Sequence, residues 1–331
     1  MAGDRPHEFE LIKRFFAPLA TDSGSLGLAD DAAVFTPRPG YDLVLTKDML
    51  AADVHFFASD PPDAIARKAL RVNLSDLAAK GARPRGYLLG LGLAVDWTAD
   101  WLERFCAGLA ADQAAFGLVL WGGDTIKSGD GLQISVTAIG EVPQASAVRR
   151  NGARAGDILY VSGTIGDGAA GLKARLDSGF AGRYGLNDYD LAHILDRYLL
   201  PRPRVDLAGA LSDHAHAAMD VSDGLFADAQ HIADASAVDL RIDLDLVPVS
   251  LALAKIRDVS PGDFTGLLGG GDDYEILACV PEVSAAAFEV GAKAADCPVT
   301  RIGEVRNGGG KVELESGGSP VRSSSAGFRH F

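Results

Sequence analysis

The sequence has few cysteines and no long apolar segment. Cys106, Cys279 and Cys297 are the three cysteines among 331 residues, and they form no CxxC pair, so we expect reduced thiols in a cytoplasm and no zinc site. Apolar runs long enough to span a membrane are absent, and Met1 to Phe16 carries acids but no apolar core of signal-peptide length. These absences predict a soluble, cytoplasmic protein that is not exported.

Positive charge is also scarce. The chain has 31 Lys and Arg against 45 Asp and Glu, which gives a formal net charge of −14. Nucleic acids and anionic membranes both bind to basic surfaces, so we expect neither as a partner. The acidic balance fits a protein that collects cations.

Two common glycine-rich nucleotide motifs do not account for this chain. GxxxxGK[ST] does not occur in it. Gly166 to Gly171 formally matches the dinucleotide fingerprint, but Gly179 to Leu200 is polar and helical where that fold needs a second strand ending in an acid. We therefore interpret these glycines as a tight helix-capping turn.

The length and the apolar content are those of an ordinary globular protein with sizeable cores. Hydrophobic residues make up 47% of the 331 residues, which is enough chain for two domains. The stretch from Pro143 to Gly156 turns polar and carries three arginines among small residues. We place the domain boundary there, between residues 1–146 and residues 147–331.

One predicted helix, Pro61 to Pro84, carries an acid on an apolar face. Helical spacing places Asp76 on that face. The other members of the face are Ile65, Ala69, Val72 and Ala79. The strip left for water consists of Arg67, Lys68, Arg71 and Ser75. A buried carboxylate is costly, so Asp76 should be neutral, be paired with a base such as Lys80, or hold a metal ion.

Other acids lie beside glycines or at the ends of predicted strands. Asp30 and Asp31 precede Ala32 to Phe35, which we expect to be a strand. Asp124 follows the predicted strand Leu118 to Trp121, after two glycines that would let the backbone approach a ligand. The remaining acids of this kind are Asp48, Asp220, Asp223 and Asp272.

If all these carboxylates lined one shared cleft, their placement at strand ends and on a buried helix face would be explained. Carboxylates with few Cys or His among them are hard oxygen ligands, which favours several Mg²⁺ ions that bridge phosphates. Such an enzyme would neutralise ATP phosphates with metal ions, helped by Arg150 and backbone amides, and would position an in-line transfer. Groupings typical of a covalent nucleophile are missing, so we expect no catalytic nucleophile.

Six motifs, in this order and spacing, resemble those of thiamine-monophosphate kinases. They are Gly27-x-x-Asp30-Asp31-Ala32-Ala33, Thr46-Lys47-Asp48 with His55-Phe56, Val72-Asn73-Leu74-Ser75-Asp76-Leu77-Ala78-Ala79-Lys80-Gly81-Ala82, Gly122-Gly123-Asp124-Thr125, Asp220-Val221-Ser222-Asp223-Gly224-Leu225, and Gly270-Gly271-Asp272-Asp273-Tyr274-Glu275. The resemblance covers essentially the whole chain. It implies a PurM-like fold with two α/β domains of mixed sheets, whose N-terminal domains pair in a homodimer. It also implies that ATP and thiamine monophosphate give ADP and thiamine diphosphate.

The resemblance assigns a role to individual positions. The positions that match the family's Mg²⁺ ligands are Asp31, Thr46, Lys47, Asp48, Asp76, Asp124, Asp220 and Asp223. Those that match its ATP contacts are Gly123, Asp124, Arg150 and Ser222. Those that match its thiamine contacts are His55, Asp272 and Phe331, although the preceding Gly- and Ser-rich stretch, Gly308 to Ser325, is expected to be mobile.

Two positions depart from the family pattern. Lys47 stands where Thr or Ser is usual, and Asp272 stands where Glu is common. The lysine is harmless if position 47 binds metal through its main-chain carbonyl, whereas a side-chain role would bring an ammonium near the metals.

Two alternatives stay open. One is another ATP-using enzyme of the same superfamily, of the purine cyclo-ligase type. The other is a non-catalytic regulator that binds nucleotide or Mg²⁺, for which Lys47 is the one hint. Selenophosphate synthetase and the hydrogenase-maturation dehydratase are disfavoured, because the first needs an early reactive cysteine and the second a terminal one.

Overall fold

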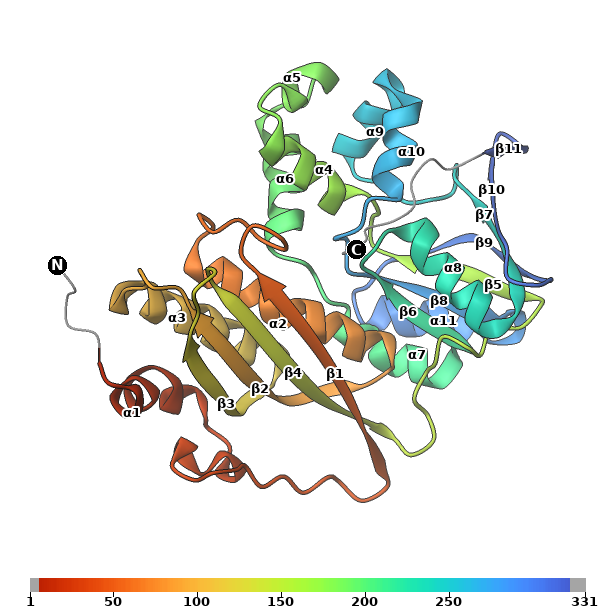
Figure 1. The fold of residues 1–331 in the computed structure, drawn as a ribbon. Coiled ribbons are helices and arrows are strands. Elements are labelled where there is room, and N and C mark those ends of the chain that lie inside the picture. Colours follow the sequence, from red (N-terminus) through yellow and green to blue (C-terminus); the bar gives the residue numbers. More distant parts are fainter. Residues whose placement is uncertain (1–5, 322–331) are drawn as a thin grey trace. The chain divides into compact units, whose positions relative to one another are not determined.

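The computed structural model describes residues 6–321, and the chain divides into two compact units (Figure 1). The first unit comprises Met1–Leu77 and Arg83–Ala145, and the second comprises Ala78–Ala82 and Ser146–Phe331. Within the described range, helices that combine the length and the apolarity needed to cross a membrane are absent.

The first unit begins with short helical turns rather than with a strand. These are α1 (Glu8–Leu11), a π-helical turn (Ile12–Phe16) and two 3₁₀ segments (Ala17–Leu19 and Ser23–Leu28). The prediction of a strand at Ala32 to Phe35 is wrong, because this segment is irregular in the structure. Phe35 instead packs its ring against Trp121, with centroids 4.4 Å apart. The apolar pair therefore anchors a loop.

A four-stranded sheet forms the body of the first unit. Its elements are β1 (Tyr41–Ala51), α2 (Pro62–Ala79), β2 (Arg83–Leu93), α3 (Ala99–Phe116), β3 (Val119–Lys127) and β4 (Gln133–Pro143). The strand order is β1-β4-β2-β3, with β2 and β3 parallel and the other pairs antiparallel. Helices α2 and α3 cover one face of this sheet (Figure 1). The other face is called the open face below.

Helix α2 differs from the prediction in its end and in its buried side. It stops at Ala79, and Pro84 already lies in β2. The strip expected to face water is largely buried, because Asp112 of α3 accepts hydrogen bonds from Arg67 at 3.0 Å and from Arg71 at 2.7 Å. Asp76, by contrast, is only half-buried. The side of α2 that carries the arginines can be buried because the carboxylate of Asp112, 41 residues after Arg71, compensates their charge.

The second unit is built on a seven-stranded mixed sheet. Its strands are β5 (Asp157–Ser162), β6 (Ala217–Val221), β7 (Val238–Asp243), β8 (Glu275–Pro281), β9 (Val299–Asn307), β10 (Val312–Ser316) and β11 (Ser319–Val321). They are ordered β11-β10-β7-β9-β5-β8-β6. Two of these strands, β10 and β11, occupy the stretch that the glycine and serine content led us to expect as mobile, so that expectation is wrong for residues up to 321.

Helices cover both faces of this sheet. They are α4 (Asp167–Leu176), α5 (Phe180–Tyr184), α6 (Asp188–Leu199), α7 (Ala208–His214), α8 (Leu225–Ser236), α9 (Leu251–Val259), α10 (Pro261–Leu268) and α11 (Glu282–Ala294), with a 3₁₀ turn at Val205–Leu207. The larger core includes residues of α4, α8, α9 and α10, and the smaller one includes residues of α7 and α11. The glycines after β5 cap α4, with Gly166 at φ +93°, which confirms the helix-capping interpretation.

Candidate active site

Three of the predicted metal ligands meet where β1 contacts α2. Along β1 the even-numbered residues Thr46 and Asp48 point to the helix-covered face, since side chains alternate along a strand. The hydroxyl of Thr46 donates a hydrogen bond to Oδ2 of Asp76 at 2.5 Å. The main-chain N–H of Asp48 donates to Oδ1 of Asn73 at 3.1 Å, which ties the strand to the helix. Asn73 is a site-forming residue to which the sequence analysis assigned no role.

The carboxylates of this cluster repel one another. Burial, and next the negative charge of Asp76, raise the pKa of Asp48 to about 6, and Lys47 opposes the shift. Two carboxylates and a hydroxyl that share a partly buried site form a hard oxygen donor set. The residues present therefore fit a divalent cation such as Mg²⁺.

The side chain of Lys47 lies on the opposite side of the sheet from this cluster. Its neighbours in sequence, Thr46 and Asp48, face α2, and Lys47 faces the open face. Its ammonium donates to Oγ of Ser135 on β4. The structure therefore keeps the lysine side chain away from the Thr46–Asp76 pair, and a metal contact at position 47 would have to come from the main chain.

A pocket of about 340 Å³ gathers a second group of predicted residues at the edge strand β3. Asp31 lines it from the loop after the 3₁₀ segments, and Gly123 and Asp124 line it from β3. Its apolar wall includes Phe16 and Trp121. The volume is at the lower end of what small-molecule sites require.

The glycine at position 123 has a structural cause. A Cβ there would lie 2.0 Å from the carbonyl oxygen of Leu89, so the close β2–β3 pairing excludes any other residue. The strand also does not stop at the glycines as predicted; it continues to Lys127. Asp124 pairs with Gly90 in register and faces the open face, so the sheet separates it from Asp48 and Asp76.

His55 lies in the turn after β1. Its Nδ1 accepts a hydrogen bond from the main-chain N–H of Ala51 at 3.1 Å. In the neutral ring the proton is then on Nε2. The residue is held by its own turn and is half-buried.

In the second unit the loops after β6 and before β8 are joined to each other. The N–H of Asp272 donates to the carbonyl of Ser222 at 2.9 Å, and the N–H of Tyr274 donates to that of Val221 at 2.8 Å. Asp272 and Tyr274 adopt φ of +62° and +52°, a region that costs energy for residues other than glycine. The predicted ATP contact Ser222 and the predicted thiamine contact Asp272 are thus neighbours.

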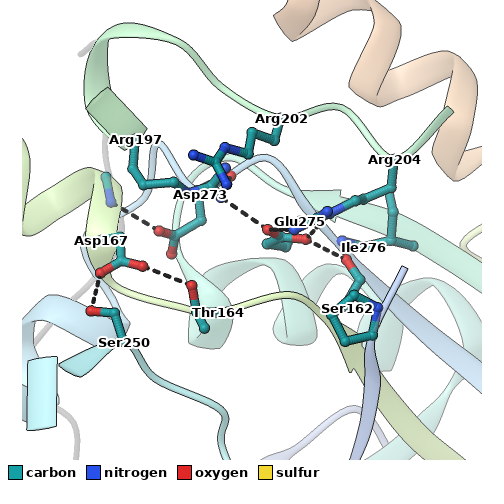
Figure 2. A network of polar contacts seen from close by, with 12 residues as sticks. Ser162, Thr164, Asp167, Arg197, Arg202, Arg204, Ser250, Asp273, Glu275 and Ile276 are labelled. Carbon is teal, nitrogen blue, oxygen red and sulfur yellow. Dashed lines mark hydrogen bonds and ion pairs between the residues drawn. The ribbon is translucent and has the colours of Figure 1, made fainter. Parts of the chain in front are cut away.

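A buried polar network holds this strained loop (Figure 2). Asp273 accepts the N–H groups of Gly166 at 2.8 Å and Gly168 at 3.0 Å, and burial raises its pKa to about 8. Arg197 donates to the carbonyl oxygen of Asp273 at 3.1 Å and to Glu275 at 2.9 Å. The acids that follow Asp272 in its motif therefore have a structural role, because they fix the backbone on which Asp272 sits.

Glu275 and Asp167 complete the network. Glu275 also accepts hydrogen bonds from Arg204 and from the hydroxyl of Ser162 at 2.6 Å. Asp167 accepts from the hydroxyls of Thr164 at 2.7 Å and Ser250 at 2.5 Å (Figure 2). Breaking such a buried pair on one side leaves an uncompensated charge, so the network resists rearrangement.

The remaining predicted residues are more dispersed. Asp220 is buried on β6, opposite Ile276 of β8, whereas Arg150 is exposed. Phe331 lies outside the described residues.

Asp223 follows Ser222, and its N–H donates to Oδ2 of Asp228 at 3.0 Å. Burial, and next the charge of Asp223, raise the pKa of Asp228 to about 7. The sequence analysis missed Asp228, although an acid in the first turn of a helix after a glycine-flanked loop is a recognisable signal.

Comparisons with known proteins agree along the whole chain. Two family models match: AIR synthase related protein, N-terminal domain, over residues 29–142, and AIR synthase related protein, C-terminal domain, over residues 154–315. The thiamine-monophosphate kinase of Caulobacter vibrioides is 46% identical over 329 residues, which cover 98% of this chain and 91% of that protein. The corresponding protein of Escherichia coli K12 is 38% identical, with 98% of each chain covered.

Solved structures give the same result. A crystal structure of thiamine-monophosphate kinase from Stenotrophomonas maltophilia has a TM-score of 0.80 and 39% identity, and covers 95% of this chain and 98% of its own. AaThiL complexed with AMPPCP and TMP has a TM-score of 0.75 and 31% identity, with 99% of each chain covered. The expected PurM-like fold with two mixed sheets is confirmed. The chain therefore belongs to the thiamine-monophosphate kinase family of phosphotransferases, within the AIR synthase related proteins.

Proposed function

We propose that this protein transfers the γ-phosphoryl group of ATP directly to thiamine monophosphate and releases ADP and thiamine diphosphate. The observation that carries the proposal is the likeness, over 99% of each chain, to AaThiL in complex with AMPPCP and TMP. The paired carboxylates of Asp48 and Asp76 support it, since phosphoryl transfer needs charge neutralisation and positioning more than a nucleophilic side chain.

The acids of both units would hold several Mg²⁺ ions. These acids and their helpers are Asp31, Thr46, the main chain of Lys47, Asp48, Asp76, Asp124, Asp220 and Asp223. When bound, Mg²⁺ withdraws charge from phosphate oxygens and orients them for in-line displacement. Residues 1–146 would bind ATP and Mg²⁺ and form the dimer, and residues 147–331 would complete the nucleotide and substrate site.

The other predicted residues would position the two substrates. Gly123, Asp124, Arg150 and Ser222 would contact ATP, and His55, Asp272 and Phe331 would contact thiamine monophosphate. The attacking phosphate oxygen is already ionised, so the chain needs no general base to activate it. The tight backbone around Asp272 would keep its carboxylate in place, which lowers the entropy lost on positioning the substrate.

The open face of the first unit supports a homodimer. Large apolar side chains share that face and remain exposed: Leu43, Leu45, Met49, Leu88 and Ile126. Apolar patches of this kind are typical of subunit interfaces. The three buried, free cysteines support a cytoplasmic location.

A coupled ADP-release assay tests the proposed reaction. We expect ADP release with thiamine monophosphate and none with thiamine or with aminoimidazole precursors. Turnover with an aminoimidazole precursor alone would identify a cyclo-ligase instead. ATP binding without turnover on any of the three would identify a non-catalytic regulator.

A further inference from the structure

Three metal-binding side chains converge at the start of helix α8. Asp228 and His231 are three residues apart on this helix and so share a face. Asp223 lies in the loop that leads into the helix. One ligand atom from each of Asp223, Asp228 and His231 lies within 4.8 Å of the other two. A single ion is therefore within reach of all three.

Asp228 gives an independent reason to expect a ligand there. Its side chain is buried, with 1% of the residue exposed. Oδ2 accepts the N–H groups of Asp223 at 3.0 Å and Gly224 at 3.1 Å. Oδ1 is buried and has no hydrogen-bond partner among residues 6–321. A buried carboxylate oxygen without a partner is costly, so a group that the protein itself does not supply should satisfy it.

The loop that carries Asp223 is held in place before any ligand arrives. Gly224 has φ +119°, and a Cβ there would lie 2.5 Å from the main chain of Gly269. A Cβ on Gly271 would lie 2.4 Å from the carbonyl oxygen of Ser222. The two hydrogen bonds to Asp228 also fix the orientation of its carboxylate. The Asp228 carboxylate and the backbone that carries Asp223 are therefore preorganised, which lowers the cost of binding.

We propose that Asp223, Asp228 and His231 form a binding site for a divalent transition-metal ion, such as Co²⁺ or Zn²⁺. Two carboxylate oxygens and one imidazole nitrogen are a mixed donor set. Imidazole favours these ions, whereas Mg²⁺ prefers oxygen ligands alone. The site shares Asp223 with the Mg²⁺ ligands of the proposed function, but Asp228 and His231 belong to neither the proposed Mg²⁺ set nor the proposed substrate contacts.

Co²⁺ is a suitable probe because it reports on its ligands. We would titrate Co²⁺ into the full-length, metal-free protein without ATP, and measure affinity by calorimetry and imidazole coordination by hyperfine-shifted ring N–H resonances. His231→Ala should weaken Co²⁺ binding at this site about tenfold or more, a loss of about 1.4 kcal/mol or more, and should abolish the shifted resonance. Mg²⁺ affinity, measured in parallel, should change less than about twofold, since Mg²⁺ does not depend on the imidazole.

Two further variants complete the experiment. His214→Ala, at the end of α7, is the matched control and should bind Co²⁺ as the wild type does. Asp228→Asn keeps the shape and an acceptor for the two N–H groups, and it should also weaken Co²⁺ binding about tenfold or more. Far-UV spectra and melting curves would establish that each variant is folded.

The outcomes separate this proposal from the proposed function. If His231→Ala or a folded Asp228→Asn binds Co²⁺ with wild-type affinity, or if no imidazole resonance shifts, the site is overturned. Kinase turnover of the wild type with ATP and thiamine monophosphate is measured separately. A protein that lacks turnover and still shows the His231-dependent Co²⁺ site would refute only the kinase.

Discussion

The hydroxyl of Thr46 lies 2.5 Å from a carboxylate oxygen of Asp76 and donates its hydrogen to it. The two residues come from different elements, strand β1 and helix α2, and Asp48 sits two residues further along the same face of the strand. A hydroxyl and two carboxylates are thereby assembled on one surface. Substitution of Asp76 therefore tests the metal-assisted mechanism.

Asp76→Asn should lower phosphoryl transfer about 100-fold or more, because it removes one ligand charge from the cluster without changing the side-chain volume. The amide oxygen can still accept from Thr46, so we expect a stability change of about 1 kcal/mol or less. Turnover and thermal unfolding are the measurements. Asp63→Asn on the same helix, whose carboxylate pairs with the exposed Arg104, is the control and should keep wild-type turnover. Wild-type turnover in Asp76→Asn would refute a role in catalysis.

Asp48 should titrate near pH 6 in the metal-free protein, because burial and the charge of Asp76 raise its pKa. The folded state then holds this proton more tightly than the unfolded state. The stabilising contribution is therefore complete at low pH and is lost as pH rises from about 4 to about 6, by at most about 3 kcal/mol.

Carbon NMR of the Asp48 carboxyl group would measure this titration. Asp76→Asn should lower the midpoint, and Lys47→Met should raise it, because Lys47 opposes the shift. Mg²⁺ binding should weaken below pH 6, where protons compete for the carboxylate. A wild-type midpoint near pH 4 would contradict the electrostatic account of this cluster.

Transfer should be direct, without a phosphoenzyme. In the first unit the carboxylates of Asp48 and Asp76 lie beside the hydroxyl of Thr46. This arrangement differs from that of a covalent nucleophile, which needs a neighbouring base and a third group that orients the base. Incubation with γ-labelled ATP alone should leave the protein unlabelled, whereas addition of thiamine monophosphate should transfer label to the product. Label that stays on the protein and then passes to added substrate would exclude direct transfer.

The apolar open face should mediate self-association. Leu45 and Met49 are 62% and 60% exposed, and Leu45→Glu or Met49→Glu would place a charge on that face. Burying an unpaired carboxylate costs several kcal/mol, so we expect monomers at concentrations where the wild type is dimeric. Sedimentation equilibrium would measure this. Val283→Glu on α11, at a residue 91% exposed, is the matched control and should leave the association unchanged. A wild type that sediments as a monomer would disprove the dimer.

Removal of Phe328 to Phe331, which lie outside the described residues, should affect one substrate only. Aromatic side chains over the partly cationic rings of thiamine would contribute roughly 0.5 to 2 kcal/mol. We therefore expect KM for thiamine monophosphate to rise about threefold to thirtyfold, with that for ATP nearly unchanged. An unchanged KM for thiamine monophosphate would show that these aromatics do not contact it.

Much of the architecture could be predicted from local patterns. The helix that carries Asp76, the strand that begins near Leu118 and the cap at Gly166 follow from spacing, apolar periodicity and glycine placement, which act within a few residues of the chain. Asp48 and Asp76 were identifiable because an acid in an apolar helix or strand is costly and needs a reason. The spacing of the six motifs was sufficient to indicate the family.

Only the tertiary structure decided which polar groups are buried and what they face. Arg67 and Arg71 were expected in water, yet Asp112 on another helix compensates their charge. The side chain of Lys47 is separated from Asp48 by the sheet, and Oδ1 of Asp228 is left without a partner within the described residues. Periodicity reports which residues of one element share a face. The cost of burying a charge depends on what a second element, distant in sequence, brings to that face.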